Sequence, residues 1–216
     1  MIRTSPLSSP AGSDPPTLGE LRKLGPEIHV LPSDTLLWRV YFRAGPYPSA
    51  WSTFRRFGPT DARFDHHGPP PAVHPTRAIL YGADSGPTCL AEVFQTTRVI
   101  DRRYRVPHLA AFELGAPISL LDVTGAWVTR AGGNMAISSG SRVRSREWSR
   151  AIYGAYPKLQ GIRYASSMNA NQPAVALYER AQPALPVAPG LDLPLDHPGL
   201  AILISDAARR FGYRVV

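Results

Sequence analysis

Hydrophobic residues occur along the chain in short blocks, separated by polar segments that contain proline or glycine. Short blocks rich in Val, Ile, Leu, Tyr and Trp, bounded by turn-forming residues, are typical of β-strands. No block is repeated at a fixed interval, and no heptad pattern runs through the chain. The pattern predicts strands at residues 28–31, 35–42, 78–82, 99–100, 110–114, 118–123, 161–166, 174–179 and 213–216.

Apolar residues spaced three or four apart, which indicate an amphipathic helix, occur in fewer places. Thr17 can cap a first helix and Asp196 a last one, because each side chain can accept a hydrogen bond from a free backbone N–H. Gly25 and Gly212 are suited to end these two helices. The pattern therefore predicts helices at residues 18–24, 147–156 and 198–211.

Residues 76–97 (TRAILYGADSGPTCLAEVFQTT) combine a strand and a helix in one segment. The strand ends near Tyr81, and Ser85 is a suitable cap for the helix that follows. An apolar stripe on this helix begins at Cys89, and Glu92 lies on its flank, about 60° around the axis. A glutamate there can lean over the end of the neighbouring strand, although a solvated glutamate is the simpler interpretation.

Many short strands with a few helices between them argue for an α+β fold rather than regular βαβ alternation. Residues 1–16 are rich in Ser, Pro and Gly, so we expect a disordered tail there and one domain over residues 17–216. Residues 43–75 are expected to form a long loop, and residues 131–146 a glycine- and serine-rich one. Residues 182–194 are proline-rich and are expected to cross the surface.

The net charge of +8 comes almost wholly from arginine, since Lys23 and Lys158 are the only lysines. Arginine grips phosphate and carboxylate groups bidentately, which favours an anionic ligand, although an arginine-biased genome would give the same excess. The single cysteine, Cys89, excludes an internal disulfide and fits a reducing cytosol. We expect a cytoplasmic protein without a membrane segment, because the chain starts with no apolar signal sequence and has no membrane-length apolar run.

Several charged residues occupy positions that suggest chemistry. Arg39 lies within an apolar, strand-forming run, and Arg55 and Arg63 stand among aromatic residues in the long loop. Taken singly, Arg39 and Arg63 are better explained as partners in surface ion pairs. His66 and His67 lack a third ligand at the spacing of a metal site, so no metal is predicted.

Three segments in the same order resemble the RES-domain family, which is named for an arginine, a glutamate and a serine. The first is LWRVYF with ARFD further along, the second is ILYGADSGPTCLAEV, and the third is GIRYASSMNANQPAVALYE. Together they cover roughly residues 26–179. The resemblance implies an ADP-ribosyltransferase-like fold, with mixed, mostly antiparallel sheets and flanking helices.

The resemblance also implies the site residues. Ser166 is the best match for the family's serine, and Ser149 and Ser167 remain alternatives. The sequence departs from the family at Ala62, where glycine is usual, and at Ala165, where proline is usual. The catalytic residues implied are Glu92, Arg39 and Ser166, and the NAD-binding residues implied are Arg63, Tyr81, Phe64 and Ser149.

Each implied residue has an expected role in cleaving the nicotinamide–ribose bond. Glu92 would stabilise the positive charge that develops on the ribose. Arg39 and Arg63 would hold the pyrophosphate, and Tyr81 would stack on the nicotinamide. Ser166 would hold the nicotinamide amide or a ribose hydroxyl.

The resemblance therefore implies a toxin of a toxin–antitoxin pair that degrades NAD by hydrolysis or phosphorolysis. NAD is then a substrate, no metal is needed, and a cognate antitoxin protein is the expected partner; homo-oligomerisation stays open. One alternative is transfer of ADP-ribose to a protein. Another is a nucleic-acid-binding module, suggested by the basic residues 142–150, although no zinc finger or helix-turn-helix signature supports direct binding.

Overall fold

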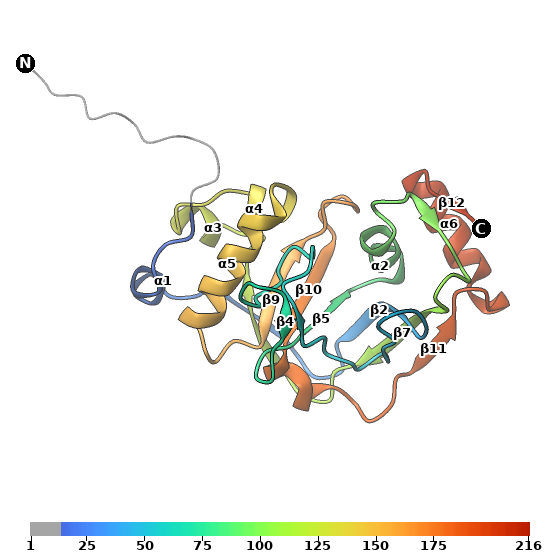
Figure 1. Cartoon of the computed structure of the whole chain (residues 1–216), viewed down its shortest axis with the longest axis horizontal. Coiled ribbons are helices and arrows are strands. Elements are labelled where there is room, and N and C mark those ends of the chain that lie inside the picture. The colour runs from blue at the N-terminus through green and yellow to red at the C-terminus, as the bar shows by residue number, and fades with distance from the viewer. Residues whose placement is uncertain (1–13) are drawn as a thin grey trace, which may run out of the picture.

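The computed structural model describes residues 14–216, so most of the predicted tail, residues 1–13, lies outside the described part of the chain. The described part is an α+β structure with a large, mostly antiparallel sheet and flanking helices, as predicted (Figure 1). The helices are α1 (Leu18–Leu24), α2 (Gly86–Val93), α3 (Trp127–Arg130), α4 (Ala136–Ser139), α5 (Arg142–Ala155) and α6 (Ala201–Phe211), with 3-10 turns η1 (Glu179–Ala184) and η2 (Pro198–Leu200).

Within residues 14–216 the main sheet contains eight strands in the order β1-β8-β9-β10-β5-β2-β7-β11. Neighbouring strands in this sheet are antiparallel, except for β8 and β9, which are parallel. Two small sheets pair β12 with β6 and β3 with β4. The strands are β1 (Ile28–Leu31), β2 (Leu36–Phe42), β3 (Phe57–Gly58), β4 (Ala72–Val73), β5 (Ile79–Ala83), β6 (Val99–Ile100), β7 (Pro107–Glu113), β8 (Ile118–Asp122), β9 (Gly161–Ala165), β10 (Pro173–Tyr178), β11 (Leu191–Pro194) and β12 (Arg214–Val215).

The central strands are buried on both faces, because successive side chains point to opposite sides of the sheet. On β10, Ala176 and Tyr178 enter one apolar cluster, which also contains residues of α2, α5 and α6. Val175 and Leu177 enter a second cluster on the other face, closed by loop residues such as Phe54. Both faces of the sheet therefore contribute to the core.

The sheet opens between β2 and β5. These two strands are paired at one position in the described chain, Trp38 opposite Ala83, whereas β2 pairs with β7 along its whole length. Beyond that position the strands separate, and the backbone of Arg55 pairs with Ile79 in place of β2. Residues of both β2 and β5 line a cavity at this opening.

Local signals predicted the first helix well. The hydroxyl of Thr17 accepts from the backbone N–H of Glu20, and the carboxylate of Glu20 accepts from the backbone N–H of Thr17. This reciprocal arrangement is a capping box, and Gly25 ends the helix. Gly212 ends α6 in the left-handed conformation, also as predicted.

Several predicted elements differ from the structure, for example the strand predicted at residues 110–114, which is β7 over Pro107–Glu113. Helix α5 begins at Arg142 rather than residue 147, because the helix extends into the glycine- and serine-rich stretch and the Ser145 hydroxyl is held by the Ile137 carbonyl. The proline-rich stretch forms an edge strand, β11, which pairs with β7. Helix α6 begins at Ala201, and the preceding 3-10 turn is capped by His197 rather than Asp196.

Among residues 14–216, no helix combines the length and the apolar character needed to span a bilayer.

Candidate active site

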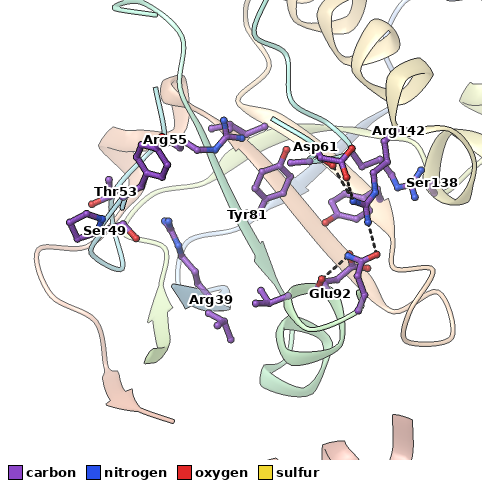
Figure 2. A pocket seen from close by; sticks show the side chains of 18 residues that line it. Arg39, Ser49, Thr53, Arg55, Asp61, Tyr81, Glu92, Ser138 and Arg142 are labelled. Carbon is purple, nitrogen blue, oxygen red and sulfur yellow. Dashed lines mark hydrogen bonds and ion pairs between the residues drawn. The ribbon is translucent and has the colours of Figure 1, made fainter. Parts of the chain in front are cut away.

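A cavity of about 410 Å³ lies at the opening between β2 and β5, and α2 and α5 contribute to its walls (Figure 2). This volume falls within the range of small-molecule sites. The walls combine arginines, aromatic rings and one glutamate. The lining residues used below are Arg39, Tyr47, Ser49, Thr53, Arg55, Asp61, Arg63, Tyr81, Glu92, Gln95, Arg142 and Tyr164.

Glu92 reaches the cavity from α2, a helix that begins with the predicted cap Ser85. Its Oε1 accepts a hydrogen bond of 2.5 Å from the hydroxyl of Ser166, the residue after β9. The Ser166 hydroxyl in turn accepts from the backbone N–H of Met168, so its proton is directed to the carboxylate. The carboxylate is thus held in one orientation by a fully buried serine.

Arg39 and Arg63 face the cavity without a carboxylate partner among the described residues. Nη1 of Arg39 donates to the carbonyl of Trp51 at 2.9 Å, and Nη1 of Arg63 donates to the carbonyl of Gly140 at 2.7 Å. Burial lowers the pKa of Arg39 to about 10, so the group remains cationic at neutral pH. The positive charge of both side chains is therefore available to an anionic ligand.

The pKa of Arg63 is also lowered, first by burial and then by the nearby cation Arg142. Arg142 itself is paired with Asp61, whose Oδ2 lies 2.6 Å from Nη1, and it donates to Gln95 at 3.0 Å. Arg55 is likewise paired with the buried Asp65, at 2.9 Å. Among the four cavity arginines, two are therefore neutralised by carboxylates and two are not.

Aromatic rings also line the cavity. Tyr81 on β5 lies between Arg39 and Glu92 in Figure 2. Its hydroxyl is buried without a hydrogen-bond partner among the described residues, and burial raises its pKa. Tyr164 on β9 forms another part of the wall and packs against Phe64, with ring centroids 4.7 Å apart. These rings offer flat surfaces to a planar ligand.

The structure brings four of the predicted residues together, since Arg39, Arg63, Tyr81 and Glu92 line one cavity. Ser166 adjoins it through Glu92 but is fully buried, so its expected contact with a ligand is corrected to a contact with the carboxylate.

Phe64 and Ser149 do not reach the cavity, and their expected direct contacts with NAD are also corrected. Both are fully buried, and the Ser149 hydroxyl donates to the Phe64 carbonyl at 2.7 Å. This hydrogen bond joins α5 to the residue that follows Arg63 in the chain. Ser167, the third candidate serine, is exposed.

Sequence reasoning missed Arg142 and Tyr164 as cavity residues. Tyr164 was signalled only by its place in the GIRYAS segment, next to the predicted serine. Arg142 belongs to the stretch expected to form a loop, and nothing in the sequence indicates that it shares a helix with Ser149. Its ion pair with Asp61 shows that part of the basic stretch is used within the molecule.

The adjacent histidines are both buried outside the cavity. His67 is 2.5 Å from a carboxylate oxygen of Asp65, and His66 stacks on the ring of Tyr153 and lies 3.7 Å from Glu179. Among the described residues, no group of three or more His, Cys, Asp and Glu side chains is arranged to hold a metal ion.

Comparison with known proteins places this site in a family. The model of the RES domain matches residues 36–196, a span that contains every cavity residue named above. No curated protein matches at a significant level. In the crystal structure of the Mycobacterium tuberculosis MbcT–MbcA toxin–antitoxin complex, one chain is similar over 76% of this chain and 85% of its own length, with 16% identity and a TM-score of 0.51. That similarity shows a shared fold, and the match over residues 36–196 shows that this chain belongs to the RES-domain family.

Proposed function

We infer that this protein is the toxin of a toxin–antitoxin pair and that it degrades NAD by cleaving the nicotinamide–ribose bond. The observation that carries the inference is the arrangement of Glu92. Its carboxylate is held by Ser166 in a cavity that also contains two guanidinium groups without a carboxylate partner among residues 14–216. The similar fold in a toxin–antitoxin complex supports the toxin role.

The geometry suits the chemistry of this bond. Its cleavage passes through a ribose that carries positive charge, and the nicotinamide leaves as a neutral group. A preorganised carboxylate stabilises that charge without further movement. Glu92 would supply the carboxylate, since the Ser166 hydroxyl already holds it in place. Water or inorganic phosphate would then attack the ribose carbon that the nicotinamide leaves, forming the new bond there.

The diphosphate of NAD requires cations that are not already neutralised. Arg39 and Arg63 meet this requirement, because their hydrogen bonds within the described chain go to neutral oxygen acceptors. Tyr81 and Tyr164 offer rings against which the nicotinamide can lie. In this arrangement the arginines bind the anionic diphosphate of NAD, and Glu92 stabilises the positive charge that develops on the ribose of the same molecule.

The direct test measures nicotinamide release from NAD by the purified full-length chain. Glu92→Gln keeps the size of the side chain and removes its charge, so we expect its rate to fall about 10²–10³-fold. Glu113→Gln, at an exposed carboxylate outside the cavity, should match the wild type. Release that is equal in the wild type and Glu92→Gln would refute the function.

The same reaction with labelled NAD separates degradation from transfer. A glycohydrolase or phosphorylase leaves the label on small molecules, whereas an ADP-ribosyltransferase leaves it on protein. We expect no labelled protein. Repeating the reaction with and without inorganic phosphate identifies the acceptor, since only phosphorolysis would depend on it.

The proposed partner is an antitoxin protein that prevents NAD loss in the cell that makes the toxin. Expression of the wild type should stop growth, and expression of Glu92→Gln should not. Co-expression of the product of the neighbouring gene should restore growth of cells that express the wild type. Persistent growth arrest would count against that gene product as the antitoxin, and normal growth on wild-type expression would count against the toxin role.

A further inference from the structure

The cavity has two ends, and the end far from Glu92 holds groups that the chemistry proposed above does not use. Glu92 lies on one side of Tyr81, whereas Arg39, Ser49 and Thr53 lie on the other side (Figure 2). If the nicotinamide ribose lies at Glu92 and the diphosphate at the arginines, the rest of the ligand extends toward Ser49 and Thr53. The groups at this second end therefore indicate what that part of the ligand is.

Tyr47 lines this end of the cavity, two residues before Ser49. It is 79% exposed, so most of its ring is open to a ligand. One face of the ring lies nearly parallel to the ring of Phe57, with an interplanar angle of 12° and a centroid distance of 6.2 Å. A flat and accessible ring on the wall of a cavity is suited to stack on a planar base.

The hydroxyl groups beside Tyr47 complement a sugar. Ser49 Oγ donates to the carbonyl of Phe42 at 3.3 Å, which leaves its lone pairs free to accept a hydrogen bond. Thr53 Oγ1 accepts from the backbone N–H of Ala50 at 3.0 Å, which leaves its proton free to be donated. An acceptor and a donor that line the same cavity match the hydroxyl groups of a ribose.

We propose that Tyr47, Ser49 and Thr53 form a nucleoside subsite that takes the adenosine half of the dinucleotide, with Tyr47 stacking on the adenine. That the other half of the ligand is a nicotinamide ribonucleotide, placed at Glu92, rests on the proposed function. Tyr47 is then the residue that selects a dinucleotide over nicotinamide mononucleotide, because the mononucleotide has no base at this end. The subsite itself needs no reaction and binds free adenine nucleotides.

Binding of ADP to the full-length chain, measured by isothermal titration calorimetry, tests the subsite without any turnover. Tyr47→Ala should weaken ADP binding about tenfold, the loss of one base–aromatic stack. Tyr47→Phe keeps the ring and should bind ADP as the wild type does. Tyr104→Ala is a matched control, since Tyr104 is 65% exposed and does not line the cavity.

Equal ADP binding by the wild type and Tyr47→Ala would overturn the subsite, as would no binding of ADP by the wild type. Thermal unfolding of each variant shows whether a loss of binding comes from a loss of fold. In the kinetic assay, Tyr47→Ala should raise KM for NAD about tenfold and leave KM for nicotinamide mononucleotide unchanged. A parallel rise for both substrates would also overturn the proposal.

The two proposals can fail separately. Tyr47-dependent ADP binding without nicotinamide release would leave the subsite standing and refute NAD cleavage. Nicotinamide release that depends on Glu92 but not on Tyr47 would support NAD cleavage and refute the subsite.

Discussion

Ser166 Oγ donates a hydrogen bond of 2.5 Å to Glu92 Oε1, joining the end of β9 to helix α2. Ser166 is itself fixed, because its backbone N–H donates to the carbonyl of Gln172 and its hydroxyl accepts from Met168. A short hydrogen bond to a carboxylate is stronger than one between neutral groups. The serine therefore sets the direction in which Glu92 faces the cavity.

Replacing Ser166 should reduce the rate rather than the affinity. Ser166→Ala removes a hydrogen bond to a charged group, which contributes about 1.5–3 kcal/mol, so we expect kcat for nicotinamide release to fall about tenfold or more. KM should change little, because Ser166 does not line the cavity. Steady-state kinetics with NAD measures both quantities.

Ser167→Ala is the matched control for this prediction. Ser167 is the next residue, is exposed, and was an alternative candidate for the family serine. Its removal should leave kcat and KM unchanged. A loss in Ser167→Ala equal to that in Ser166→Ala would show that the loop, not the hydrogen bond to Glu92, controls the rate.

Replacing Arg63 should act mainly on binding. Lysine keeps the charge but lacks the planar fork that holds a phosphate bidentately and that donates to Gly140. We expect Arg63→Lys to raise KM for NAD about tenfold, the loss of one charge-assisted hydrogen bond. Arg56→Lys, at an exposed arginine of the same loop, should leave KM unchanged. A fall in kcat alone would instead assign Arg63 to the chemical step.

Glu179 predicts how stability depends on pH. Burial alone would raise its pKa, but the nearby His66 ring, the Tyr153 hydroxyl and the Ala78 N–H outweigh burial and hold the pKa at about 2. Since the usual pKa is 4.5, the ionised group stabilises the fold above pH 4.5, and this stabilisation is lost as the pH falls toward 2.

Glu179→Gln should therefore lower the free energy of unfolding at pH 7 by about 2 kcal/mol and flatten its decline between pH 4.5 and 2. Urea denaturation at several pH values measures both effects. Glu113→Gln should leave the curve unchanged, because that carboxylate is exposed. A wild-type stability that stays constant from pH 4.5 to 2 would contradict the role given to Glu179.

The elements that depend on neighbouring residues could be predicted from the sequence. Helix α1 has its capping box within four residues, and Gly212 ends α6 without help from distant groups. The start of α5 could not be predicted in this way, because Ser145 is held by Ile137 and Arg142 by Asp61. Likewise, β11 exists as a strand because β7 offers it a free edge.

The sequence alone determined the α+β class and four of the residues that line the cavity. The class follows from the periodicity of strands and helices, and the four residues follow from the family's ordered segments. Both are patterns within short stretches of the chain. Only the tertiary structure decided which serine contacts Glu92, which arginines lack a carboxylate partner among the described residues, and where Tyr47 lies. These relationships join residues far apart in the chain. They depend on the opening of the sheet between β2 and β5, and no local sequence pattern predicts that opening.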